Sequence, residues 1–78
     1  MTRAIKDIAK EIKQVWAKPN YAAVPYLDAM LQVEKPDDMY YAEKASTLIS
    51  YFLSNASTFR GEDARRLKAE LKKVIGEK

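Results

Sequence analysis

The apolar positions near both ends of the chain recur every three or four residues, which is the spacing of amphipathic helices. The stripe within residues 3–17 consists of Ile5, Ile8, Ile12, Val15 and Trp16. The stripe within residues 62–75 consists of Ala64, Leu67, Leu71, Val74 and Ile75. Neither follows the strict alternation of a half-buried strand. We therefore predict a helix at each end, with Thr2 as N-cap of the first and Gly76 just after the last.

Two further helices are predicted between the polar breaks at residues 19–20, 35–38 and 55–61. Residues 20–33 are apolar nearly all round, which indicates a buried central helix or a surface for self-association. Pro25 leaves two interpretations: the helix begins near it, or a first turn capped by Asn20 bends there. Residues 39–55 are predicted as one long helix capped by Asp37 or Asp38. Its apolar stripe comprises Tyr41, Ala45, Leu48, Ile49, Phe52 and Leu53.

Together these segments predict an all-α fold, a single domain of 78 residues with four helices around one core. Apolar residues make up 47% of the chain and charged residues 32%, which is the balance of a folded globular domain. No apolar run approaches the roughly 18 residues that a membrane span needs, and no signal-peptide pattern opens the chain. We therefore expect a cytoplasmic protein without membrane contact.

The chain contains no Cys and no His. These absences exclude disulfides, thiolate sites, His-based triads and the usual structural zinc sites. Glu34, Asp37 and Asp38 form the one cluster of acids, and their spacing fits no calcium-binding loop. N-capping of a helix explains the two aspartates better. We therefore expect neither enzymatic activity nor a bound cofactor or metal.

The charges are distributed unevenly. Residues 1–18 carry five Lys or Arg and two acids, residues 57–78 carry seven and four, and residues 19–56 carry two and five. On a helical wheel, the cations of each terminal helix gather on one flank away from acids. These candidate phosphate-contacting residues are Arg3, Lys6, Lys10, Lys13, Arg65, Lys68 and Lys72. They favour nucleic-acid binding, although solvated charged faces of amphipathic helices follow the same pattern.

The aromatic residues suggest a protein interface instead. Adjacent helical residues point about 100° apart, so Tyr40 and Tyr41 cannot both face one core stripe. One of them is expected to be half-exposed, either in an interface or at the rim of the core. The segment Phe59-Arg60-Gly61 at the last helical joint has two interpretations: a staple that starts the helix, or a recognition loop. The candidate interface residues are therefore Tyr40, Phe59 and Arg60.

Three segments resemble a family of short uncharacterised proteins of tailed bacteriophages. They are PYLDAM (residues 25–30), YFLSNA (residues 51–56) and the pattern RG-x-x-A formed by Arg60, Gly61 and Ala64, followed by a Lys-containing amphipathic tail. The resemblance covers roughly residues 20–75, and Phe59 stands where the family often has Trp. It implies a phage origin, and hence a protein that acts on a host or phage macromolecule, but it implies no particular activity.

The function expected from these features is that of a cofactor-free protein-binding module, encoded by a phage and acting in the bacterial cytoplasm. Two alternatives stay open. The basic flanks of the first and last helices favour a nucleic-acid-binding or regulatory protein. The apolar second helix favours a structural or self-assembling protein.

Overall fold

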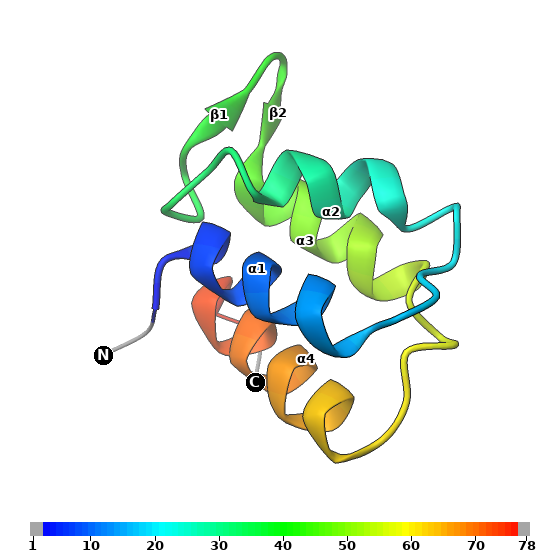
Figure 1. The fold of residues 1–78 in the computed structure, drawn as a ribbon. Coiled ribbons are helices and arrows are strands. Elements are labelled where there is room, and N and C mark those ends of the chain that lie inside the picture. Colours follow the sequence, from blue (N-terminus) through cyan, green and yellow to red (C-terminus); the bar gives the residue numbers. More distant parts are fainter. Residues whose placement is uncertain (1–2, 77–78) are drawn as a thin grey trace.

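The computed structural model describes residues 3–76, which fold into four helices and one short hairpin (Figure 1). The helices are α1 (Ile5–Val15), α2 (Val24–Met30), α3 (Ala45–Ser54) and α4 (Glu62–Val74). The strands β1 (Met39–Tyr40) and β2 (Glu43–Lys44) pair antiparallel between α2 and α3. The prediction of a mainly helical chain with four helices is confirmed. The all-α assignment was incomplete, because the hairpin was not predicted.

Helix α1 lies in the middle of the fold. Figure 1 shows α2 on one side of it and α4 on the other, with the hairpin projecting away from the helices. The main packing pairs are α2 with α3, α1 with α4, and α1 with α2. Helices α3 and α4 make few direct contacts, and the loop between them carries the chain from one pair to the other.

The core is a single cluster of apolar side chains drawn from all four helices and the loops that join them. Its largest fully buried side chains are Ile5, Ile8, Ile12, Leu27, Met30, Ile49, Phe52, Leu67 and Leu71. At one end, Trp16 meets Phe52 edge-on, with 6.1 Å between ring centroids, and stacks on Phe59 at 4.8 Å. The predicted stripes are confirmed for most positions. Val15 and Tyr41 are exposed, so their assignment to the core was wrong.

Residues 39–44 form the hairpin and not the first turns of a long helix, so α3 begins at Ala45, later than predicted. Its first amides, at Ala45 and Ser46, donate to the backbone carbonyls of Asp38 and Pro36 at 2.8 and 2.9 Å. The Asp38 carboxylate accepts hydrogen bonds from the amides of Lys35 and Glu34, both at 2.9 Å. These bonds lower the pKa of Asp38, the Lys35 amide contributing most. Asp38 therefore closes the preceding turn. The prediction that Asp37 or Asp38 caps α3 was wrong, because the residue at the N-cap is Lys44.

The other helix starts differ from the sequence predictions in detail. Helix α1 begins after Ala4, and the proposed N-cap Thr2 lies outside the described residues. Helix α2 begins at Val24 with Pro25 in its first turn, where a missing amide hydrogen costs little. The interpretation in which the helix begins near Pro25 is therefore confirmed. The turn before it is closed by the Ala23 amide, which donates to the Asn20 carbonyl at 2.8 Å, and the Asn20 side-chain amide ties this turn to the end of α3 by donating to the Asn55 carbonyl at 3.0 Å.

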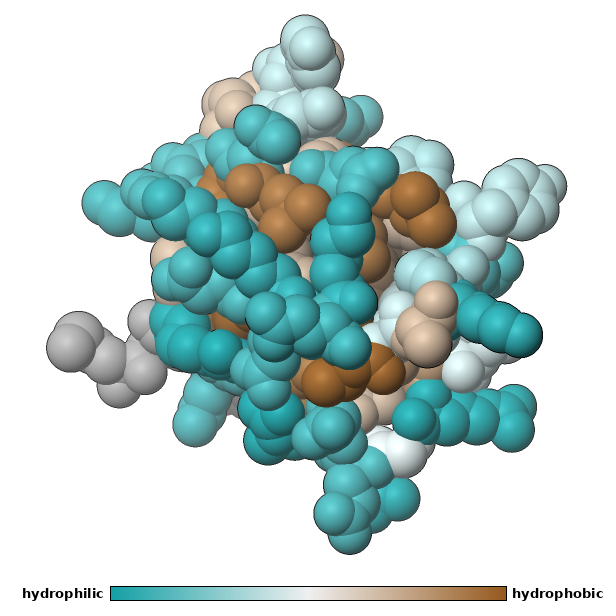
Figure 2. Space-filling model, viewed as in Figure 1, coloured by the Kyte–Doolittle hydropathy of each residue, from teal (hydrophilic) through white to brown (hydrophobic). Residues whose placement is uncertain are grey.

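Within residues 3–76, no helix is long and apolar enough to cross a membrane. The same residues contain no group of three His, Cys, Asp or Glu side chains placed to hold a metal ion. The face shown in Figure 2 is mostly hydrophilic, with separate small hydrophobic patches. This face therefore offers no continuous apolar surface for self-association.

Candidate functional site

The hairpin presents apolar side chains to solvent that the core does not use. Met39 is 57% exposed and Tyr41 is 89% exposed, whereas Tyr40 is partly buried against the core. The ring of Tyr41 meets that of Tyr40 edge-on, with 4.8 Å between centroids. We call Met39, Tyr40 and Tyr41 the hairpin tip. Tyr40 is therefore anchored against the core, and the exposed Tyr41 ring packs on it.

Tyr41 also has an unusual backbone conformation. It is the first of the two loop residues between β1 and β2, and its φ of 57° is the one positive φ of a non-glycine residue in the described part of the chain. Two-residue hairpins need a positive φ at this position, and glycine, asparagine or aspartate normally supplies it. For tyrosine the left-handed conformation costs about 1–2 kcal/mol. The fold therefore holds a large aromatic residue where a small one is easier to accommodate.

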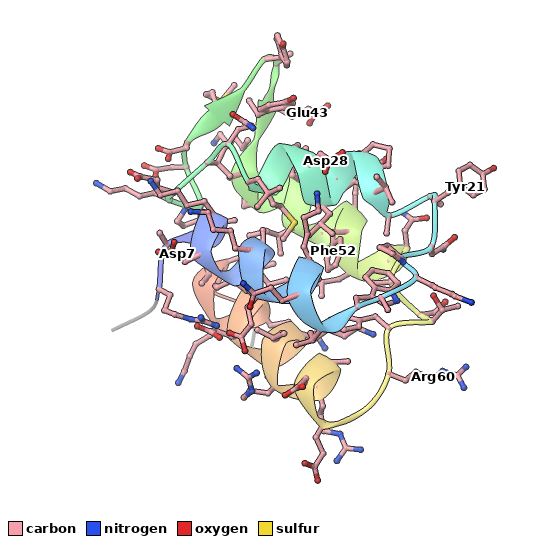
Figure 3. The ribbon with its side chains drawn as sticks, in the orientation of Figure 1. Asp7, Tyr21, Asp28, Glu43, Phe52 and Arg60 are labelled. Atoms are coloured by element: carbon pink, nitrogen blue, oxygen red, sulfur yellow. The ribbon has the colours of Figure 1, made fainter. Side chains whose placement is uncertain are left out.

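The joint before α4 does not form a recognition loop around Phe59. That side chain is 3% exposed and stacks on Trp16, so a partner cannot reach it without unfolding the joint. Arg60 is exposed and its side chain points away from the fold (Figure 3). Its Nε donates to the Ser57 carbonyl at 3.3 Å. Gly61 has a φ of 109°, which only glycine adopts readily. The interpretation of Phe59 as a staple is favoured, although its ring packs across to the end of α1 as well as beside α4.

The candidate phosphate-contacting residues of α1 turn out to be largely paired with acids. Arg3 binds Glu70 through two hydrogen bonds of 2.7 Å and Glu11 through an ion pair of 2.8 Å. Arg66 of α4 binds Glu11 as well. These bonds lower the pKa of Glu11, with Arg66 the larger cause, and lower the pKa of Glu70 through Arg3. The cluster joins α1 to α4 and leaves Arg3 engaged.

Two lysines of α1 pair with acids near α2. Lys6 binds Glu34, and Lys13 lies 3.5 Å from Asp28. Lys10 is exposed and has no ion-pair partner among residues 3–76. The interpretation of this flank as free of acids was wrong for Arg3, Lys6 and Lys13. Their partners Glu70, Glu34 and Asp28 lie outside α1, where a wheel of one helix cannot show them, and Glu11 of α1 itself also pairs with Arg3.

The cations of α4 lie along a groove. Two hollows of about 380 and 390 Å³ share Lys68 in their lining, the first between α4 and the loop before it and the second between α3 and α4. We call them together the α3–α4 groove. Its lining residues are Ser50, Leu53, Ser54, Phe59, Arg60, Gly61, Ala64, Arg65, Lys68 and Lys72. Four of these are cations and none is an acid. The groove faces α3, whereas the paired cluster faces α1, so the two basic flanks do not form one surface.

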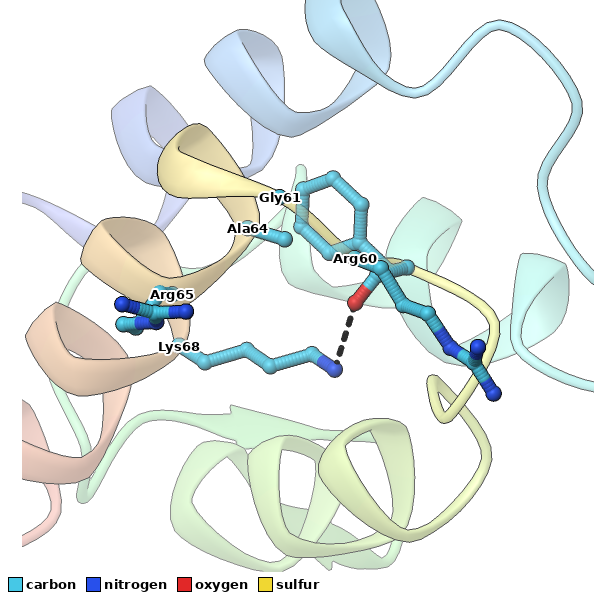
Figure 4. Close-up of a pocket in the computed structure, with 6 residues that line it drawn as sticks. Arg60, Gly61, Ala64, Arg65 and Lys68 are labelled. Carbon is cyan, nitrogen blue, oxygen red and sulfur yellow. Dashed lines mark hydrogen bonds between the residues drawn. The ribbon is translucent and has the colours of Figure 1, made fainter.

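Lys68 occupies the centre of this groove and is fixed there. Its ammonium donates to the carbonyls of Ala56 and Phe59, both at 2.7 Å, and lies 5.7 Å from the centroid of the Phe59 ring. Figure 4 shows the side chain stretching from α4 toward the loop, with Arg65 near its base. Partial burial lowers the pKa of Lys68, and the positive charges of Lys72 and Arg60 lower it further. Cations are therefore crowded at this point.

Sequence reasoning missed two features of these surfaces. It did not identify Met39 and Tyr41 as exposed neighbours, because no glycine or asparagine marks the turn between them and β2. It also missed the serines of α3 that face the basic flank, since nothing in the sequence shows which helix lies across the groove.

Comparison of the chain with models of known protein families, with curated proteins and with solved structures finds no match. The resemblance to a phage family therefore stays a prediction.

Proposed function

We propose that the protein is a small, cofactor-free module that binds a protein partner through the hairpin tip. The observation that carries this proposal is the placement of Tyr41: almost fully exposed, held against Tyr40, and kept in a strained conformation. Backbone strain in a folded protein is often found where a site is pre-organised for function. Packing in the core does not explain the strained backbone of Tyr41, because its side chain is exposed.

The chemistry of the tip suits a protein surface better than a small ligand. Tyrosine offers a large apolar area together with one hydroxyl, and it is enriched among the residues that dominate protein interfaces. Methionine beside it adapts to irregular apolar surfaces. The contact between the two tyrosine rings limits the motion of Tyr41 before binding, so less conformational entropy is lost on association. The tip projects from the fold and offers a convex element for a partner's concave surface (Figure 1).

The partner is proposed to be a host or phage protein of the bacterial cytoplasm. This part of the proposal rests on the resemblance to short phage proteins. Of the three candidate interface residues, Tyr40 belongs to the tip as its anchor. Phe59 is buried and is not part of the proposed interface, and Arg60 lies in the α3–α4 groove.

The test compares two tyrosines of nearly equal exposure. Tyr41 is 89% exposed and Tyr21, at the opposite end of α2, is 87% exposed (Figure 3). The parent, Tyr41→Ser and Tyr21→Ser are immobilised and challenged with nuclease-treated bacterial lysate. A discrete protein should bind the parent and Tyr21→Ser and should be lost with Tyr41→Ser, because losing a hot-spot side chain costs about 2 kcal/mol or more.

Equal capture by both variants would contradict the proposal, as would the absence of any discrete captured protein. Thermal melts of all three proteins show whether the loss is one of contact or of folding. If the captured protein is the chain itself, and light scattering shows a dimer that Tyr41→Ser dissociates, the self-assembling alternative replaces the proposal.

A further inference from the structure

The α3–α4 groove is independent of the hairpin tip, and its charges call for a different partner. Arg65, Lys68 and Lys72 leave α4 at intervals of three and four residues, which places them on one side of the helix. From Arg65 to Lys72 the helix rises about 10 Å at 1.5 Å per residue. Lys68 lines both hollows, so the cations are spread along one side of α4 rather than gathered at a single point.

The acids of α4 do not neutralise this path. Asp63 and Glu70 are engaged with Arg66 and Arg3, on the side of α4 that faces α1. Glu62, in the first turn of α4, forms no ion pair with a groove cation of the described residues. Residues 3–76 contain six ion pairs, and none of them includes a cation of the groove. An external anion entering the groove would relieve the repulsion among these charges.

We infer that the α3–α4 groove binds the phosphodiester backbone of nucleic acid, with Arg65, Lys68 and Lys72 as the phosphate-contacting residues. These three cations, spread over about 10 Å of α4, can each contact one phosphate of the backbone. No exposed aromatic side chain is among the groove residues, so base stacking is not provided. The groove therefore recognises the backbone and not the sequence.

An acidic peptide is the competing ligand, and the groove suits it less well. A bound peptide needs acceptors for its backbone amides. The loop carbonyls of Ala56 and Phe59 already accept hydrogen bonds from Lys68. The hydroxyls of Ser50 and Ser54 donate within α3, to the carbonyls of Ser46 and Ser50. The remaining hydrogen-bond donors of the groove side chains belong to Arg and Lys, and such cationic donors suit a chain of phosphates.

The test measures binding of a fluorescein-labelled, random-sequence DNA duplex by anisotropy at several salt concentrations. Three phosphate contacts predict a slope of about −2.7 in log K against log salt, so affinity should fall about 40-fold between 50 and 200 mM salt. Lys72→Gln should make the slope shallower by about 0.9. Lys73→Gln is the matched control: it is the next residue, equally charged and exposed, and lines neither hollow.

No binding at 50 mM salt would overturn the inference. So would equal changes of slope in Lys72→Gln and Lys73→Gln, since they would reflect overall charge and not the groove. Tighter binding of labelled polyglutamate, with the same dependence on Lys72, would replace nucleic acid by an acidic protein segment. Tyr41→Ser should bind the duplex like the parent, which separates this inference from the function proposed for the hairpin tip. Circular dichroism of each variant confirms that it is folded.

Discussion

Replacing Phe59 by alanine should destabilise the protein far more than replacing its neighbour Arg60. The Phe59 ring is 3% exposed and stacks on Trp16 with 4.8 Å between centroids. Truncating a buried phenylalanine to alanine typically costs about 3–5 kcal/mol. Phe59 borders a hollow into which neighbouring groups can relax, so we expect a loss of about 3 kcal/mol in the free energy of unfolding. A domain of this length has a total stability of about 4–12 kcal/mol.

Urea denaturation followed by two probes measures the loss in the free energy of unfolding and shows whether the region around Phe59 is affected. Trp16 is the single tryptophan of the chain, so its fluorescence reports directly on the stack with Phe59, while far-ultraviolet circular dichroism reports on the helices. Arg60→Ala is the control: the side chain is exposed and has one hydrogen bond, to the Ser57 carbonyl, so its loss should change stability by no more than about 0.5 kcal/mol. A loss below about 1 kcal/mol for Phe59→Ala, or equal losses for the two variants, would refute the structural role of Phe59.

Two further outcomes concern the start of α4 and the cluster that joins it to α1. Gly61→Ala should cost about 1–3 kcal/mol through backbone strain alone, because φ is 109° and nothing lies within 4 Å of an added Cβ; unchanged urea stability would contradict this. Glu11 and Glu70 have lowered pKa values in the fold, so their stabilisation is complete above about pH 4.5 and is lost as the pH falls through those lowered values. Melting temperatures of the parent should therefore fall more steeply below that pH than those of Glu70→Gln, and parallel curves would show that the cluster contributes nothing.

The helical stripes were predictable because burial repeats with the helical period. Ile5, Ile8 and Ile12 in α1, and Leu67 and Leu71 in α4, are buried as their spacing requires. The start of α4 at Glu62 also agrees with the sequence, since Gly61 supplies a positive φ and two acids occupy the first turn. These features depend on local chemistry and on one helix at a time.

The hairpin and the pairing of charges were not predictable in the same way. Tyr40-Tyr41-Ala42-Glu43 contains none of the usual turn residues, and tertiary bonds from Ala45 and Ser46 decide where α3 begins. The partners of Arg3 lie in α1 and α4, so the pairing depends on how these two helices cross. Of the candidate site residues, Tyr40 lies beside the exposed Tyr41, and Lys68 and Lys72 line the α3–α4 groove. Their roles in binding stay predictions.

The most direct test of the proposed function is site-specific photo-crosslinking at the hairpin tip. The photoreactive analogue benzoylphenylalanine replaces Tyr41 in one protein and Tyr21 in another, and both are produced and irradiated in bacterial cells. The analogue at position 41 should yield one discrete cross-linked protein, and the analogue at position 21 should not, because only the tip is proposed to contact the partner. The same cross-linked product from both positions, or none from position 41, would contradict the account.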